Sequence, residues 1–340
     1  MKIVLYTMEY PPQKGGVANY YAGLIKAMGK SREVAVKVLP ATSRWWNVMI
    51  NIILHKANIV WVGQILPIGT VAWICHKIFK TKYIVSLHGM DINLAQQNKS
   101  NLTARILKGA GLITVNSEYT KKQINNYLDL ESKIEIVYPC PNIDYVHDEE
   151  LVARVKQAYG LAEKRILLSV GRLVERKGMQ NVIQLMPELI LKYPNLIYII
   201  IGAGDNLPEL QRLIQTKKLE EHVKVLTGVG NQELTAFYYL ADIFIMPTID
   251  DGIDVEGFGI VYLEAGVYAK PVIATPVGGA SEAVIDNETG LLVEKNNLSV
   301  AIEKLLEDHG LATKFGANAQ QLIKSKYSYT IQVKKILQRL

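Results

Sequence analysis

Two glutamates lie in the apolar segment GIDVEGFGIVYLEAG (residues 252–266), where an unpartnered charge is costly to bury. Glu256 precedes a predicted helix that starts near Gly259, and Glu264 lies roughly a turn and a half inside that helix. With Glu256 in the preceding loop, both carboxylates can reach different points of one elongated ligand. A carboxylate accepts hydrogen bonds from two sugar hydroxyls at once, so a sugar-containing ligand explains both positions. The alternative is a helix-start charge and an exposed helix position, which the apolar neighbours of Glu264 disfavour.

A cationic loop, GRLVERKG (171–178), directly follows a predicted strand. The guanidinium fork of Arg172 and the point charge of Lys177 together suit a diphosphate. Glycines bracket this loop, which favours a close approach of the backbone to a ligand. Solvated surface charges remain the alternative for either residue taken alone.

Three further features follow predicted strands. Gly15 and Gly16 precede a helix, whose first amides can bind a phosphate, and the pair Gly202 and Gly204 in GAGD permits a similar approach. His88, in SLHGMD, is the histidine best placed for a ligand-binding edge. A tight turn without a ligand is the alternative for each glycine pair. None of these matches G-x-G-x-x-G, so a nicotinamide cofactor lacks its main support.

No metal or cofactor is expected. The other five histidines are scattered without the spacing of metal ligands. The aspartate-rich stretch 250–254 is more typical of a solvated turn than of a metal site.

These residues need elements to position them, and the sequence predicts two series of alternating strands and helices. The first series has its strands at 2–7, 33–39, 58–63, 82–89, 112–117 and 134–139. The second has its strands at 165–171, 195–202, 222–228, 243–247, 271–276 and 290–294. Such alternation indicates parallel sheets with helices on both faces. We therefore expect an α/β protein with a domain at 1–146, a linker at 147–164 and a domain at 165–326. Ligands are then expected at the carboxyl ends of the strands, in a central cleft.

Composition limits the class of protein. The 340 residues are 49% hydrophobic and 21% charged, as in a globular protein, and the two cysteines favour a reducing, cytoplasmic location. Residues 1–160 carry 19 Lys and Arg against 11 Asp and Glu, a net charge of +8, which indicates an anionic partner. Nucleic acid is not expected, because no recognition-helix, zinc or aromatic-platform pattern is present. No signal-peptide layout or membrane-spanning run is seen either.

The segment RWWNVMINIILHK (44–56) offers one candidate for an anionic partner. Trp45 and Trp46 stand beside basic residues, a pattern typical of a membrane interface. A helix packed against the first sheet is the alternative, because apolar residues surround it almost completely. If the segment does contact a membrane, we expect peripheral binding to the inner, anionic face of the cell membrane.

Taken together, these motifs resemble the retaining glycosyltransferases of family 4. The resemblance rests on the E-x7-E pattern, GRLVERKG, the early Gly-Gly, LHGMD and PVGGASEAV (276–284), and it covers nearly the whole chain. It implies the GT-B architecture, with two Rossmann-like domains, and a final helix, 327–340, that crosses back to the first domain. The local sequence DVEGFGIVYLEA is similar to that of bacterial phosphatidylinositol mannosyltransferases, which use GDP-mannose.

The resemblance also implies roles for residues. Arg172 and Lys177 would hold the diphosphate of a nucleotide-sugar donor, and Glu264 would accept from the ribose hydroxyls. Glu256 would bind a hydroxyl of the transferred sugar, and His88 would lie beside that sugar. The remaining donor-binding positions are Gly16, Gly202, Gly204, Phe258, Gly259 and Ile260. Gly15 is expected on the acceptor side, and Trp45 and Trp46, from their own pattern, on the acceptor or membrane side.

The expected reaction is transfer of a hexose to a hydroxyl of a glycan or lipid-linked acceptor, by front-face attack without a metal. A UDP-sugar donor is the alternative for the nucleotide. A nucleotide-sugar epimerase and a non-catalytic nucleotide-sugar binding protein are the alternatives for the function, and a donor panel that records nucleotide release and sugar transfer would separate them.

Overall fold

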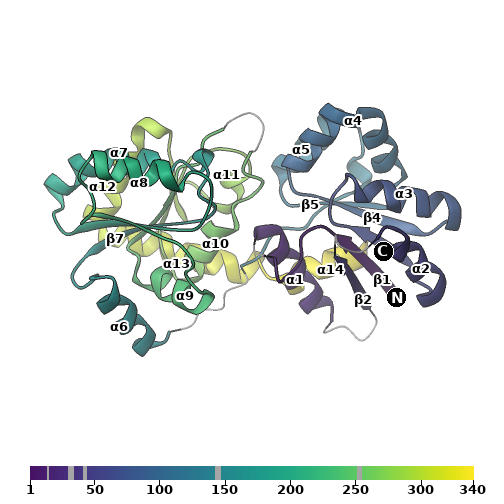
Figure 1. The fold of residues 1–340 in the computed structure, drawn as a ribbon, viewed down its shortest axis with the longest axis horizontal. Helices are drawn as coiled ribbons and strands as arrows, with labels where there is room; N and C mark the ends of the chain where they lie inside the picture. The colour runs from purple at the N-terminus through teal and green to yellow at the C-terminus, as the bar shows by residue number, and fades with distance from the viewer. Residues whose placement is uncertain (14, 30–33, 41–43, 142–146, 251–254) are drawn as a thin grey trace. The chain divides into compact units, whose positions relative to one another are not determined.

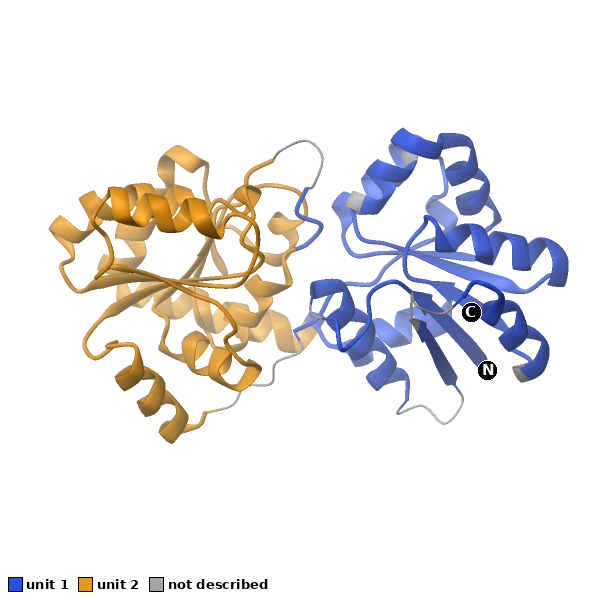
Figure 2. Ribbon diagram, viewed as in Figure 1, with its two compact units in different colours: residues 1–142, 253–258, 326–340 blue, residues 143–252, 259–325 orange. Residues whose placement is uncertain are grey.

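The computed structural model describes residues 1–340 except 14, 30–33, 41–43, 142–146 and 251–254 (Figure 1). The chain divides into two compact units (Figure 2). Unit 1 comprises Met1–Asn142, Ile253–Phe258 and Lys326–Leu340, and unit 2 comprises Ile143–Gly252 and Gly259–Ser325. The expected domain boundary at residue 146 lies outside the described residues.

Unit 1 is built on a parallel sheet that has, among the described residues, six strands in the order β2-β1-β3-β4-β5-β6. The strands are β1 (Lys2–Thr7), β2 (Ala35–Pro40), β3 (Ile59–Val62), β4 (Lys82–Leu87), β5 (Leu112–Val115) and β6 (Ile134–Ile136). The helices are α1 (Gly16–Met28), α2 (Trp46–His55), α3 (Ile68–Phe79), α4 (Met90–Gly109, kinked at Lys99), α5 (Glu118–Tyr127), the 3-10 turn η1 (Glu131–Lys133) and α14 (Tyr329–Gln338).

Unit 2 repeats this plan, and its described residues form a six-stranded parallel sheet in the order β12-β11-β10-β7-β8-β9. The strands are β7 (Arg165–Val170), β8 (Leu196–Ile201), β9 (Val223–Leu226), β10 (Ile243–Met246), β11 (Val272–Ala274) and β12 (Gly290–Leu292). The helices are α6 (Glu149–Ala158), η2 (Glu175–Lys177), α7 (Met179–Lys192), α8 (Leu207–Thr216), α9 (Asn231–Leu240), α10 (Ile260–Val267), α11 (Ala280–Ala283), η3 (Lys295–Asn297), α12 (Leu298–Glu307) and α13 (His309–Lys326).

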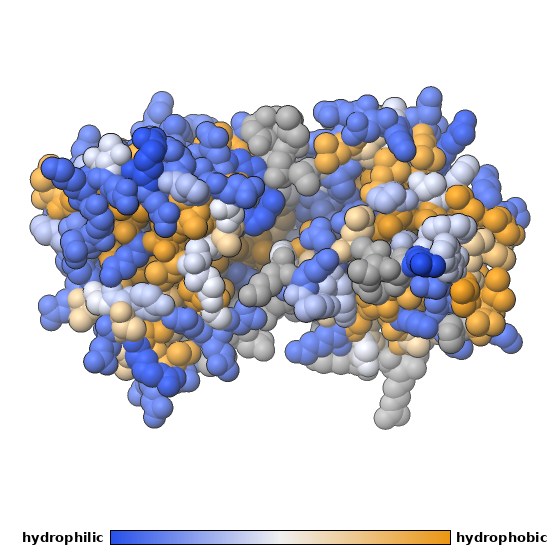
Figure 3. Space-filling model, viewed as in Figure 1, coloured by the Kyte–Doolittle hydropathy of each residue, from blue (hydrophilic) through white to orange (hydrophobic). Residues whose placement is uncertain are grey.

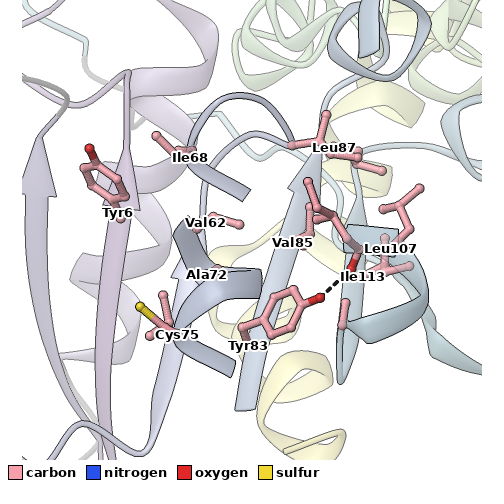
Figure 4. Packing of buried hydrophobic residues seen from close by; sticks show 14 of the residues in the cluster. Tyr6, Val62, Ile68, Ala72, Cys75, Tyr83, Val85, Leu87, Leu107 and Ile113 are labelled. Carbon is pink, nitrogen blue, oxygen red and sulfur yellow. Dashed lines mark hydrogen bonds between the residues drawn. The ribbon is translucent and has the colours of Figure 1, made fainter. Parts of the chain in front are cut away.

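Helices cover both faces of the unit 1 sheet, which explains why its inner strands β1, β3, β4 and β5 are buried almost throughout rather than alternating. Side chains along β1 point to opposite faces in turn. Ile3 and Leu5 join a core that contains residues of α1 and α14, while Val4 and Tyr6 join a core that contains residues of α2, α3 and α4. Figure 4 shows the second core, in which the Tyr83 hydroxyl bonds the carbonyl of Ile106.

The helix α14 is part of unit 1, and polar contacts fix it there. The Tyr329 hydroxyl donates to the carbonyl of Cys140 at 2.9 Å. The fully buried side chain of Gln332 accepts from the amide of Tyr138 (3.1 Å) and donates to the carbonyl of Lys326 (2.9 Å). A buried amide with both ends bonded stabilises one docking position and disfavours others.

The predicted fold class is confirmed: both units are α/β with doubly wound parallel sheets. Residues 147–164, expected as a linker with a helical segment ending near Tyr159, contain the helix α6 and group with unit 2. The Asp148 side chain caps this helix by accepting from the amide of Leu151 (3.0 Å). The Tyr159 hydroxyl then ties its end to Glu233 of α9 at 2.8 Å.

None of the helices in the described part of the chain combines the length and the apolar character needed to cross a lipid bilayer.

Candidate active site

His88 lies directly after β4, at the carboxyl edge of the unit 1 sheet. Its Nε2 is 2.9 Å from the hydroxyl of Tyr21 in α1, and this hydroxyl also donates to the carbonyl of Gly63 at 2.9 Å. Burial lowers the pKa of His88 to about 4, against the opposite influence of the Gly63 carbonyl. His88 is therefore a neutral imidazole near pH 7.

The segment that carries Glu256 is packed onto unit 1 through its aromatic residue. The Phe258 ring lies against Tyr138 and Tyr327, with ring centroids 5.5 and 5.6 Å apart. Phe258 is 2% exposed, and all three rings belong to unit 1. Aromatic burial of this kind holds the short segment in place against the sheet edge.

Gly257 brings the same segment directly against His88. A Cβ added at Gly257 would lie 2.3 Å from the carbonyl oxygen of His88 and 2.6 Å from Nδ2 of Asn116, so only glycine fits. Asn116 itself donates to the His88 carbonyl at 3.1 Å. Glu256, the adjoining residue, is 9% exposed. The structure thus places the glutamate of this loop and His88 in one neighbourhood of unit 1.

Gly15 and Gly16 lie at the start of α1, as the sequence predicts. Gly15 is the N-cap residue and brings no side chain to the first helical amides. Both glycines are exposed, so a ligand can approach these amides closely.

In unit 2 the cationic loop follows β7. Arg172 is exposed, whereas Lys177 in η2 is buried (8% exposed). Gly178 ends the loop with a left-handed φ of 72°, and a Cβ there would lie 1.9 Å from the carbonyl oxygen of Pro247. Pro247 directly follows β10, the neighbour of β7 in the sheet. The loops after β7 and β10 are therefore in backbone contact, and Gly178 makes that contact possible.

Gly202 and Gly204 are explained by packing between the loops after β7 and β8. A Cβ at Gly202 would lie 1.8 Å from the carbonyl oxygen of Gly171, and one at Gly204 would lie 2.3 Å from that of Leu173. The Leu173 amide also donates to the carbonyl of Ala203 at 2.9 Å. This packing fixes the loop that carries Arg172 and Lys177.

The helix α10 begins at Ile260, after Gly259 with a left-handed φ of 86°. Its N-terminus has no side-chain cap, and the amide of Tyr262 already donates to the carbonyl of Gly259 at 3.0 Å, so the amides of Ile260 and Val261 are the ones left for an anion. Glu264, in the second turn, is buried (8% exposed), and its Oε2 accepts from the Tyr238 hydroxyl at 2.9 Å. Burial raises the pKa of Glu264 to about 7, although the hydrogen bond from Tyr238 opposes the rise.

The predicted site residues therefore fall into two groups. Unit 1 holds Gly15, Gly16, Trp45, Trp46, His88, Glu256 and Phe258, and unit 2 holds Arg172, Lys177, Gly202, Gly204, Gly259, Ile260 and Glu264. In the described residues, no group of three or more His, Cys, Asp or Glu side chains could hold a metal ion. Asp251 and Asp254 of the aspartate-rich stretch lie outside those residues.

Trp45 and Trp46 lie at the start of α2 and do not join the loops described above. Their side chains are 53% and 40% exposed, whereas Val48 and Ile52 on the opposite face are buried in the core of unit 1. The exposed apolar residues of α2 and α3 are Trp45, Trp46, Ile50, Ile53, Leu54, Ile74 and Ile78. Figure 3 shows hydrophobic residues over this part of unit 1. The segment thus both packs on the sheet and exposes an apolar surface.

Three residues that matter to this site were not found from the sequence: Tyr21, Asn116 and Tyr238. Asn116 follows β5 in LITVNS, so the rule that ligands meet strand ends could have indicated it. Tyr21 and Tyr238 lie inside helices that carry several aromatic residues, and no local pattern separates them from core tyrosines.

The sequence of this chain matches a known protein family. The family model described as glycosyl transferases group 1 matches residues 153–322. A GDP-mannose-dependent alpha-(1-6)-phosphatidylinositol monomannoside mannosyltransferase of Mycolicibacterium smegmatis is 28% identical, over 92% of this chain and 91% of that protein. A related monoacylated-substrate mannosyltransferase of Corynebacterium glutamicum is 27% identical, over 98% of this chain and 96% of that protein.

Solved structures show the same fold. HepE of Anabaena, crystallised with UDP-glucose, has a TM-score of 0.81 at 18% identity, covering 99% of this chain and 100% of that one. WaaG, a glycosyltransferase involved in lipopolysaccharide biosynthesis, has a TM-score of 0.71 at 16% identity, covering 97% and 98%.

Proposed function

This chain belongs to the glycosyl transferases group 1 family, and we propose that it is a retaining transferase that moves a hexose from a nucleotide-sugar to a hydroxyl acceptor. One observation carries the proposal. At the carboxyl edge of the unit 2 sheet, the adjacent strands β7 and β10 bring the loop of Arg172 and Lys177 against Pro247, the residue directly after β10. These two cations, with the N-terminus of α10 in the same unit, would form an anion-binding surface that suits a diphosphate.

Mannose from GDP-mannose is the donor we favour, because the mannosyltransferase relatives span nearly the whole chain. A UDP-sugar is the second candidate, since HepE, which shares the fold, was crystallised with UDP-glucose. With either donor, Arg172 and Lys177 would bind the diphosphate of the nucleotide-sugar, and Glu264 would bind its ribose. The transferred sugar would contact Glu256, His88 and the amides of 258–260, while Gly16, Gly202 and Gly204 would border the donor.

The proposed chemistry needs no carboxylate nucleophile. The bond from the anomeric carbon to the diphosphate oxygen breaks, and the acceptor oxygen bonds to that carbon on the same face. The acceptor's proton passes to the departing diphosphate oxygen, which preserves the anomeric configuration. Arg172 and Lys177 stabilise the charge that develops on the diphosphate, so we expect transfer without a metal.

A panel of donors tests the function directly. GDP-mannose, UDP-glucose and UDP-N-acetylglucosamine are compared by thermal shift, because a ligand that binds the folded state raises the melting temperature. Nucleotide release and sugar transfer to glycan and lipid-linked acceptors are then measured with each donor that binds. We expect GDP-mannose to give the largest shift and to be transferred. Epimerised sugar without nucleotide release, or binding without any reaction, would contradict transferase activity.

The pKa of Glu264 gives a second expectation. An ionised carboxylate accepts two ribose hydroxyls better than a neutral one, so donor affinity should fall as pH falls through about 7. If only the ionised form binds well, affinity at pH 6 should be about tenfold lower than at pH 8. Calorimetry with the intact nucleotide-sugar measures this, because its diphosphate does not titrate in that range. The Glu264→Gln variant should bind weakly at both pH values; a pH slope equal to that of the unmodified protein would exclude this role.

We further propose that the acceptor is lipid-linked and that unit 1 binds an anionic membrane peripherally. The support is the exposed apolar surface of α2 and α3, together with basic residues beside it. The Arg44 guanidinium lies 4.9 Å from the Trp46 ring, and Lys77 lies between Ile74 and Ile78 in α3. Tryptophan beside cations is typical of the interface between lipid and water.

Vesicle co-sedimentation tests this surface. Vesicles of phosphatidylcholine with phosphatidylglycerol should bind the protein in low salt, and the Trp45→Ala/Trp46→Ala variant should bind at least about tenfold more weakly, or about 1.4 kcal/mol. Leu191→Ala, at an 84% exposed leucine of unit 2, is the matched control and should bind as the unmodified protein does. Equal binding of the tryptophan variant would remove the surface from the proposal.

A further inference from the structure

The hydroxyl of Tyr21 lies between two groups and has one proton to donate. It is 2.9 Å from the carbonyl oxygen of Gly63 and 2.9 Å from Nε2 of His88. A carbonyl oxygen can only accept, so the Tyr21 proton must point to Gly63. If that proton pointed to His88 instead, two oxygens would face each other at 2.9 Å without a proton between them. Nε2 of His88 must therefore be the donor to Tyr21.

This chain of bonds determines the tautomer of His88. A neutral imidazole carries one proton, and here that proton is on Nε2. Nδ1 is then an acceptor with an available lone pair. The imidazole is neutral near pH 7, because burial lowers its pKa to about 4. The hydrogen bonds of Tyr21 to Gly63 and His88 thus leave Nδ1 as an acceptor. Nδ1 can accept a hydrogen bond from a hydroxyl, but it cannot donate one to a carbonyl.

Rings and backbone contacts keep the imidazole from turning. The rings of Tyr20 and Tyr21 both meet it edge-on, at centroid distances of 5.3 and 5.6 Å. The His88 amide donates to Oδ1 of Asp91 at 2.9 Å, and its carbonyl accepts from Asn116 at 3.1 Å. A ring flip would break the bond to Tyr21, so the bond selects one of the two ring orientations.

We propose that Tyr21 is a positioning residue that holds His88 in its Nε2-protonated tautomer and presents Nδ1 as a hydrogen-bond acceptor to a hydroxyl of the transferred sugar. The inference rests on the proposed function, in which His88 lies beside that sugar. It adds that the group of the sugar that His88 recognises must be a hydrogen-bond donor. Tyr21 acts through His88 and makes no contact with substrate of its own in this scheme.

Tyr20 supplies a matched control. It neighbours Tyr21 in α1, it is equally buried, and its hydroxyl also donates to a backbone carbonyl, that of Val137 at 3.4 Å. Its ring touches His88, but its hydroxyl has no bond to the imidazole. Tyr20→Phe and Tyr21→Phe therefore remove the same atom from similar surroundings, and only the second removes the proposed constraint.

Long-range 15N–1H correlation spectra of histidine-labelled protein read the tautomer directly, with the His88 signals assigned by their loss in His88→Gln. We expect the Nε2–H pattern in the unmodified protein and in Tyr20→Phe, and a mixture of both tautomers in Tyr21→Phe. This measurement needs no donor, so it stands even if the proposed function fails. An Nδ1–H pattern in the unmodified protein, or an unchanged pattern in Tyr21→Phe, would overturn the proposal.

Kinetics with the donor found in the panel give the second readout. Tyr21→Phe should lower kcat about tenfold, as expected from the loss of about one hydrogen bond to the sugar, and should leave the affinity for the nucleoside diphosphate unchanged. Tyr20→Phe should keep kcat within about twofold. Melting temperatures of the two variants should agree; equal losses of kcat in both variants would reduce Tyr21 to a structural role and refute the proposal.

Discussion

Replacing Glu256 with glutamine is expected to lower the rate of sugar transfer by at least about 100-fold while leaving nucleotide affinity within a few-fold. Glutamine keeps the volume of the side chain, so the packing of Gly257 on His88 and of Phe258 on Tyr138 is retained. What changes is the charge: a buried carboxylate accepts from sugar hydroxyls more strongly than an amide oxygen does. Steady-state transfer kinetics measure the first effect, and calorimetry with the nucleoside diphosphate measures the second.

Glu220→Gln, at an exposed glutamate of unit 2, is the control and should behave as the unmodified protein does. Two outcomes can be told apart. Loss of both transfer and nucleotide affinity would indicate that the segment has moved, whereas full transfer activity would show that Glu256 does not bind the sugar.

Replacing Lys177 with methionine is expected to reduce kcat/KM by about 100- to 1000-fold, as removal of one preorganised charge-stabilising group commonly does. Methionine retains much of the apolar stem of this 8% exposed side chain and removes only its charge. Unlike Glu256→Gln, this change should also weaken binding of the nucleoside diphosphate, because the lysine would contact the diphosphate in both ground state and transition state.

The matched control is Lys192→Met. Lys192 is a surface lysine of unit 2 that pairs with Glu303 at 2.6 Å and Glu307 at 3.1 Å. Exposed ion pairs contribute little to stability, so this variant should keep both activity and nucleotide affinity. If Lys177→Met matched Lys192→Met in both measurements, the cationic loop would not be the diphosphate site.

The sequence was sufficient for the parallel sheets, because strands that are buried on both faces are apolar along their length. β1, for example, was predicted at 2–7 and is found at Lys2–Thr7. Strand ends then indicated where His88, Arg172 and Lys177 should lie, because parallel strands align their carboxyl ends. Gly259 and Ile260 were likewise predicted at a helix start, and α10 begins there.

Contacts between residues far apart in sequence could not be predicted in this way. Nothing local in DVEGFG indicates that Phe258 packs with Tyr138 and Tyr327 of unit 1, so the assignment of this segment to unit 1 required the structure. The hydrogen-bond partners of His88 and Glu264 could not be predicted either, because Tyr21 and Tyr238 lie 67 and 26 residues away from them in the sequence. For α2, apolar residues occur on almost every side of the helix, so the sequence did not predict which face is buried.

The position of α14 bears on the order in which the chain folds as it is synthesised. Val333 and Ile336 of this helix complete the core face formed by Ile3 and Leu5, and Gln332 bonds Tyr138 beside it. All residues of unit 2 precede this helix in the sequence. The first unit to leave the ribosome is therefore the last to be completed, and its apolar α1 face stays uncovered until α14 has left the ribosome. That interval is when a chaperone would be most useful to this protein.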